Sequence, residues 1–96
     1  MYVIVVGCGR IGSELASRLY RQGHTVVVLD KDKDAFKNLP DDFRGKTLAG
    51  DVLDKELLLR AGIEGADALA MVTPVDSVNA VVARAAKLEW KTRNIV

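Results

Sequence analysis

Hydrophobic residues along the chain alternate between short continuous runs and stripes with helical spacing. Largely apolar runs cover residues 2–6, 25–29 and 68–72. A shorter strand is predicted at residues 46–49, before Gly50 and Asp51, and the start of another at residues 94–96. Runs of this length, bounded by glycine or aspartate, are typical of strands that are covered on both faces of a sheet. The pattern therefore predicts about five strands.

The first helix is predicted over Arg10–Arg21, between the first two strands, and Gly23 ends it. Apolar residues recur there at intervals of three and four, the spacing of one face of a helix. The predicted apolar face consists of Ile11, Leu15, Ala16 and Leu19.

Three further helices are predicted. A short, charged helix covers residues 31–39 and is closed by Pro40. Another is capped by Asp54 and ends at Gly62. The last opens at Thr73 and Pro74, because proline suits an early position that needs no amide donor. Its predicted buried stripe comprises Val78, Val81, Val82, Ala85 and Leu88.

Strand–helix alternation with short connections indicates an α/β fold, in which a parallel sheet carries helices on both faces. The 96 residues suit one domain with one modest core. We therefore expect a single Rossmann-like, doubly wound domain over residues 1–96. Because the sequence stops on apolar Ile95 and Val96, a six-stranded domain cut short at the C-terminus is expected.

A glycine motif lies between the first strand and the first helix. Gly7, Gly9 and Gly12 have the spacing G-x-G-x-x-G, which is typical of dinucleotide-binding βαβ units. Gly7 would permit the tight turn, Gly9 would let phosphate approach the backbone, and Gly12 would let the helix pack closely. The free amides of the helix N-terminus would then face a pyrophosphate. The alternative is a glycine turn without a ligand.

An acidic residue, Asp30, ends the second strand about 20 residues after the glycine motif. A carboxylate at this place can accept hydrogen bonds from ribose hydroxyls and disfavours the extra phosphate of NADP. The prediction is therefore NAD or NADH, or alternatively ATP, ADP or AMP. Lys31 and Lys33 weaken the argument against NADP, and Asp30 could instead cap the next helix.

The composition and charge of the chain reduce the number of possible functions. The formal net charge of +1 and the dispersed Lys and Arg argue against nucleic-acid binding. A single cysteine, Cys8, excludes an intrachain disulfide and favours a reducing cytoplasm. The apolar run at residues 3–6 is too short to cross a bilayer, so no direct membrane insertion is expected.

Beyond the glycine motif, the sequence resembles the RCK/TrkA-N family, the regulators of potassium channels and of Trk/Ktr potassium uptake systems. The resemblance rests on GCGRIG, VVVLDKD and AGDVLDKELLLRAGIEGADALAMVTPVDSVN, which together span nearly the whole chain. It implies that a nucleotide binds at the carboxyl ends of the strands and is sensed without being consumed. It also implies a homodimer or larger ring on the cytoplasmic side of a membrane channel or transporter.

The resemblance further implies a set of site residues. The loop would hold the phosphates, Asp30 and Lys31 would meet the ribose, Asp51 and Val52 would border the adenine, and Thr73 would lie near the phosphates or the second ribose. The loop residues are Gly7, Cys8, Gly9, Arg10, Ile11 and Gly12. Val52 departs from the family, which more often has a small residue there.

Several of these residues have simpler interpretations. Arg10 could be an ordinary exposed arginine instead of a phosphate ligand that reaches across a dimer. Asp51 could be a turn residue, and Asp76 and Asn79 could hold the loop after the fourth strand. Cys8 is either a redox-sensitive thiol at a helix N-terminus or a small buried residue in a tight turn.

Three functions remain open at this stage. The chain is a nucleotide-sensing regulator, the cofactor-binding fragment of an NAD-dependent oxidoreductase, or an assembly domain whose nucleotide site has lapsed. We favour the regulator and expect no enzymatic activity and no catalytic residues. The single histidine, His24, precedes the second strand, far from the expected ligand, and a catalytic base must reach the reacting atom.

Overall fold

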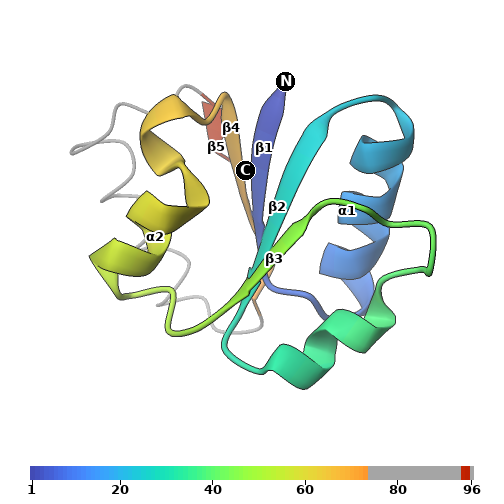
Figure 1. Ribbon diagram of the computed structural model, residues 1–96, viewed down its shortest axis with the longest axis horizontal. Helices are drawn as coiled ribbons and strands as arrows, with labels where there is room; N and C mark the ends of the chain where they lie inside the picture. Colours follow the sequence, from blue (N-terminus) through green and yellow to red (C-terminus); the bar gives the residue numbers. More distant parts are fainter. Residues whose placement is uncertain (74–93, 96) are drawn as a thin grey trace.

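The computed structural model describes residues 1–73 and 94–95. It contains a five-stranded parallel sheet in the order β3-β2-β1-β4-β5, seen nearly edge-on in Figure 1. The strands are β1 (Tyr2–Val6), β2 (Thr25–Asp30), β3 (Lys46–Ala49), β4 (Ala68–Met71) and β5 (Asn94–Ile95). Because β1 lies at the centre, both of its neighbours extend the sheet outward from it.

Two α-helices cover opposite faces of this sheet (Figure 1). Helix α1 (Arg10–Arg21) lies on one face and α2 (Lys55–Ala61) on the other. Two short 3-10 helices, η1 (Lys33–Asn38) and η2 (Ile63–Gly65), lie in the connections that follow β2 and α2. The α/β fold with a parallel sheet between helical layers is thus confirmed.

The alternation of side chains along β1 explains why both faces are apolar. Ile4 and Val6 belong to a core cluster shared with Leu58 of α2, whereas Val3 and Val5 belong to a second cluster shared with α1 through Ala16. Successive side chains of a strand point to opposite faces, so one continuous apolar run supplies both clusters. This is the arrangement that the run at residues 2–6 predicts.

The segment after β2 differs from its prediction. An α-like helix was expected over residues 31–39, but η1 is a 3-10 helix over Lys33–Asn38. Asp32 caps it by accepting a hydrogen bond from the Asp34 amide, and Leu39 is already extended. The residue before a proline is restricted to extended backbone, so the helix ends before Leu39 and Pro40. Strand β4 also ends one residue early, at Met71 instead of Val72.

The prediction that Ile11 lies on the buried face of α1 is wrong, because Ile11 is 71% exposed. The buried residues of α1 are Gly12, Ser13, Ala16 and Ser17. At about 100° per residue, Ile11 lies opposite the middle of that face. Small residues turn inward because the helix approaches the sheet closely, and two of them are serines that a hydropathy pattern excludes.

Some predictions concern residues outside the described part of the chain. The helix expected after Thr73 and Pro74, with its stripe of valines, falls there, and so do Asp76, Asn79 and Val96. The expected fifth strand is confirmed over Asn94–Ile95.

Cys8 is fully buried in the cluster beneath α1. Burial of the thiol, together with the neighbouring Asp30 carboxylate, raises its pKa from 9.0 to about 11. A protonated, buried thiol is a poor nucleophile, so the structure supports the small-residue interpretation of Cys8 over the redox one.

This raised pKa predicts a pH effect on stability. The folded state holds the Cys8 proton more tightly than the unfolded state, so its stabilising contribution is complete below pH 9 and is lost as the pH rises toward 11. Urea unfolding between pH 8 and pH 11 should show a steeper fall in the free energy of unfolding for the wild type than for Cys8→Ala. Parallel curves for the two proteins would show that the thiol does not titrate in this way.

Candidate functional site

A cavity of about 560 Å³ lies at the carboxyl ends of the parallel strands. Three backbone hydrogen bonds extend the pairing of the strands to the residues at the base of the cavity. Gly7 N–H donates to the Leu29 carbonyl (2.7 Å), Val72 N–H to the Val6 carbonyl (2.9 Å), and Gly50 N–H to the Asp30 carbonyl (3.0 Å). These bonds fix the start of the loops that leave the sheet at this edge. Ligands of open α/β sheets bind at the same edge.

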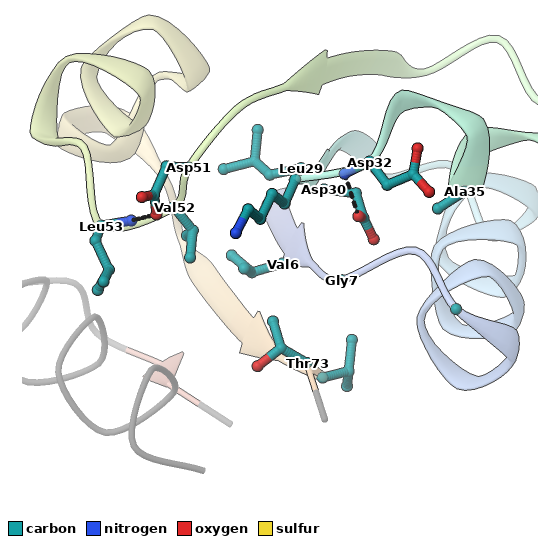
Figure 2. A pocket seen from close by; sticks show the side chains of 13 residues that line it. Val6, Gly7, Leu29, Asp30, Asp32, Ala35, Asp51, Val52, Leu53 and Thr73 are labelled. Carbon is teal, nitrogen blue, oxygen red and sulfur yellow. Dashed lines mark hydrogen bonds between the residues drawn. The ribbon is translucent and has the colours of Figure 1, made fainter. Parts of the chain in front are cut away.

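Four connections contribute to the wall of the cavity. In Figure 2, Asp51, Val52 and Leu53 lie on the left, Asp30 and Asp32 lie on the right, and Thr73 lies at the bottom. The lining comprises Val6, Gly7, Gly9, Leu29, Asp30, Lys31, Asp32, Ala35, Asp51, Val52, Leu53, Val72 and Thr73. Residues far apart in sequence therefore meet around a single space.

Gly7 and Gly12 are required by backbone packing. Gly7 has a φ of +107°, and a Cβ there would lie 2.8 Å from the Val72 carbonyl oxygen. A Cβ on Gly12 would lie only 1.8 Å from the Gly7 carbonyl oxygen. A side chain at Gly7 would push the loop away from the backbone that follows β4, and one at Gly12 would push the first turn of α1 away from the loop.

Gly9 is different, because a Cβ built there meets no atom within 4 Å. Its backbone, with φ −75° and ψ −160°, is also allowed for other residues. Folding therefore does not require glycine at this position. Gly9 lines the cavity, and a bare backbone there leaves room for a ligand to approach closely.

The N-terminus of α1 lies beside Gly9 and supplies hydrogen-bond donors. Gly9 is the N-cap and, having no side chain, supplies no side-chain capping bond, and the first turn contains no acidic residue. The leading amides of a helix have no acceptor within the helix, and the helix dipole adds partial positive charge. This end of α1 is suited to an anion such as a phosphate.

Asp30 connects the strand end with the glycine loop. One carboxylate oxygen accepts a hydrogen bond from Cys8 N–H (2.7 Å), and the other accepts from Asp32 N–H (2.8 Å); Figure 2 shows the second bond. A carboxylate has about four acceptor positions, so Asp30 can hold the loop and still accept from ribose hydroxyls.

The β3–α2 connection is held by its own aspartate. Asp51 accepts a hydrogen bond from Leu53 N–H (2.9 Å), as Figure 2 shows, and this is the local turn that the simpler interpretation of Asp51 predicts. Val52 lines the cavity and also packs against the cluster that contains Ile4. Leu53 is 50% exposed and lies at the rim. Together they form a partly apolar wall suited to a flat aromatic base.

Seven of the eleven predicted site residues line the cavity, namely Gly7, Gly9, Asp30, Lys31, Asp51, Val52 and Thr73. Cys8, Arg10, Ile11 and Gly12 are outside the lining. Cys8 and Gly12 are buried behind the loop, whereas Arg10 and Ile11 are exposed on the first turn of α1. Of the loop residues, only Gly7 and Gly9 therefore border the cavity.

The lining also contains residues that the sequence analysis did not name as site residues. Asp32 and Ala35 come from η1 and its cap, and Leu53 directly follows Val52 in the β3–α2 connection. The sequence could have indicated two of these residues as site residues. Asp32 lies two residues after Asp30, and Leu53 is an apolar residue outside any predicted strand or helix. No such signal marks Ala35.

Metal sites and membrane-spanning helices are two further features that a domain of this kind could contain. No group of three or more His, Cys, Asp or Glu side chains that could hold a metal ion occurs among residues 1–73 and 94–95. In the same part of the chain, no helix has the length and apolar character needed to span a membrane.

Comparison with curated proteins identifies similar sequences. The Trk system potassium uptake protein TrkA of Streptomyces coelicolor is 41% identical over 95 residues, covering 99% of this chain and 43% of that protein. A TrkA homolog of Pyrococcus abyssi is 33% identical, covering 91% of this chain and 38% of that protein. The chain therefore spans less than half the length of these two relatives.

Solved structures with the same fold include two with known ligands. The C-terminal domain of Kef from Shewanella denitrificans, in its AMP-bound form, has a TM-score of 0.82 and 25% identity, covering 99% of this chain and 57% of that one. UDP-glucose 4-epimerase of Thermus thermophilus, complexed with NAD, has a TM-score of 0.77 and 24% identity, covering 99% of this chain and 36% of that one. The second likeness concerns the fold alone.

The model of the TrkA-N domain family matches residues 3–96. This match covers the glycine loop, all four strand ends that form the cavity, and the strand at Asn94–Ile95. Taken with 41% identity to a TrkA protein across nearly all of the chain, it shows that this chain belongs to the TrkA-N domain family.

Proposed function

We propose that the chain is a nucleotide-sensing regulatory domain of a potassium uptake system. In this proposal the cavity binds NAD or NADH, or alternatively ATP, ADP or AMP, and does not chemically change it. The observation that carries the proposal is that the N-terminus of α1, which has no side-chain cap, and the Asp30 carboxylate lie beside the same cavity. The first suits phosphate and the second suits ribose.

The role of each residue follows from its position. The amide of Gly9 and those that follow it would bind the phosphates, and Asp30 would accept hydrogen bonds from the ribose nearest the adenine. Val52 and Leu53 would contact the base, with Asp51 holding their loop. Lys31 and Thr73, both in the lining, would contact the ribose and the phosphates. Asp30 and Asp32 would together disfavour a ribose 2′-phosphate, and hence NADP.

Two likenesses support regulation over catalysis. Three relatives that share 31% to 41% identity across most of this chain are named as potassium uptake proteins or their homologs, and the Kef domain of the same fold was solved with AMP. The alternative, a cofactor-binding fragment of an oxidoreductase, has weaker support. His24 lies in the turn before β2, with Nδ1 3.0 Å from the Met1 amino group, at the end of the sheet opposite the cavity.

The proposed mechanism is a shift between two geometries of an assembly. A homodimer or ring of these domains would lie on the cytoplasmic face of the membrane, held there by a potassium channel or transporter subunit. A nucleotide that bound one dimer geometry more tightly would favour it by the difference in its two affinities. Arg10, exposed beside the cavity, would reach a phosphate in its own or a neighbouring subunit.

Calorimetric titration with NAD, NADH, ATP, ADP and AMP tests binding, and two glycine variants test the site. Gly9→Ala should lower the affinity for ADP by about tenfold or more, because its methyl group would occupy the phosphate position. Its melting temperature should stay close to that of the wild type. Gly12→Ala should instead lower the melting temperature by about 10 °C or more, since its Cβ collides with the Gly7 carbonyl.

The proposed site would be disproved if none of these nucleotides bound the wild type below millimolar concentration. It would also be disproved if Gly9→Ala bound ADP as tightly as the wild type does.

Because Asp30 also holds the loop, its contact with ribose needs a double-mutant cycle. The wild type should bind ADP about ten- to a hundredfold more tightly than 2′,3′-dideoxy-ADP, the gain expected from hydrogen bonds to a charged group. In Asp30→Ala this preference should vanish, even though loss of the loop bonds weakens both ligands. A preference that survives in Asp30→Ala would assign the ribose contact to another residue.

The assembly is tested by its geometry in solution. Small-angle X-ray scattering of the full-length protein should show a dimer or larger ring whose dimensions change when ADP replaces buffer. The same dimensions in both conditions would contradict the mechanism, although the binding site itself could still be correct.

A further inference from the structure

The glycine loop is held at Cys8 from three directions. Its N–H donates to Asp30 (2.7 Å), its carbonyl accepts from the Asn38 side-chain amide (3.0 Å), and its thiol is buried in the core. From this arrangement we infer that Asn38 is a positioning residue, which aims the Gly9 N–H into the nucleotide cavity. The inference rests on the proposed function and names a residue that neither the glycine motif nor the cavity lining contains.

The peptide group before Cys8 shows how such a bond fixes a direction. Every described peptide bond is trans, so the C=O and N–H of one peptide point in opposite directions. Cys8 N–H points to Asp30, and the Gly7 carbonyl should therefore point away from Asp30. It does, since that oxygen faces Gly12 so closely that a Cβ there would lie 1.8 Å from it.

The same rule applies to the peptide between Cys8 and Gly9. Asn38 holds the Cys8 carbonyl on the side of a second groove, which Asn38 borders together with Ser13 and Ser17 of α1. The Gly9 N–H, at the other end of this rigid plane, must point the opposite way. Without the bond, the plane could rotate about the flexible backbone of Gly9, because glycine tolerates φ and ψ values that other residues avoid.

The opposite way is the cavity side. Gly9 belongs to the cavity lining, whereas Asn38 borders a separate shallow groove with Ser13, Ser17 and Pro40. Because Asn38 is absent from the cavity lining, the effect inferred for it is exerted through the peptide that it holds.

The position of Asn38 is fixed by the packing of η1. It is the last residue of η1, whose first residues are capped by Asp32. Ala35 and Phe36 of the same element, and Leu39 after it, pack against the core cluster that contains Cys8. A donor on a packed element loses little conformational entropy when it makes its bond, which makes Asn38 suitable for holding the loop before a ligand arrives.

The test compares ADP with adenosine, because only ADP uses the phosphate-facing amides. In Asn38→Leu, which removes the donor and keeps a similar volume, the preference for ADP over adenosine should fall about five- to tenfold, the value of one hydrogen bond. Asn38→Gln, which retains an amide donor, should recover part of the preference. Gln22→Leu removes an exposed amide at the other end of α1 and should leave it unchanged.

Amide NMR supplies a second readout that a purely stabilising residue would not alter. In the wild type the Gly9 N–H resonance should shift strongly on addition of ADP, and in Asn38→Leu this shift should shrink. If Asn38→Leu weakens ADP and adenosine equally and leaves the Gly9 shift intact, the inference is overturned while the proposed site stands. If the wild type binds neither ADP nor any of the other nucleotides, the proposed function fails and this inference fails with it.

Discussion

The close approach of α1 to the carboxyl end of β1 is the constraint on which the rest of the structure depends. The Gly7 carbonyl lies so near the first turn of α1 that only glycine fits at position 12. The helix then presents Gly12, Ser13, Ala16 and Ser17 to the sheet. This contact brings the unpaired amides of the helix to the edge where all the parallel strands end, and there they can act on a ligand.

Structural roles and the proposed ligand-binding roles fall on the same residues in this small domain. Asp30 ends a strand, holds the peptide before Cys8 and presents free lone pairs to the cavity. Asp51 closes a turn and lines the same space. Because these bonds form without a ligand, the loops are already placed when one arrives, and preorganisation reduces the entropy cost of binding. In the proposed site, a substitution at either aspartate would therefore change stability and affinity together, and a substitution at Gly9 separates the two effects more cleanly.

The sequence predicted local features well and side-chain directions less well. The four main strands, α1 and α2, the loop glycines and Asp30 all follow from periodicity and spacing, because each depends on neighbours within a few residues. Ile11 was misplaced because the pattern weighed hydropathy, whereas the buried face of α1 was selected by size. A short helix was expected over residues 31–39, whereas the structure has a 3-10 helix over Lys33–Asn38 that begins after the cap at Asp32 and ends before Pro40.

The sequence by itself determined the parallel α/β architecture and the place of the glycine loop at the start of α1. These follow from apolar runs long enough for buried strands and from backbone conformations open mainly to glycine. Only the tertiary structure decided which side chains surround the cavity and which hold the loop from behind. Asn38 meets Cys8 across 30 residues of chain, and Ala35 reaches the cavity from η1. Contacts of this kind depend on how packed elements are placed in three dimensions, and no local sequence pattern encodes that placement.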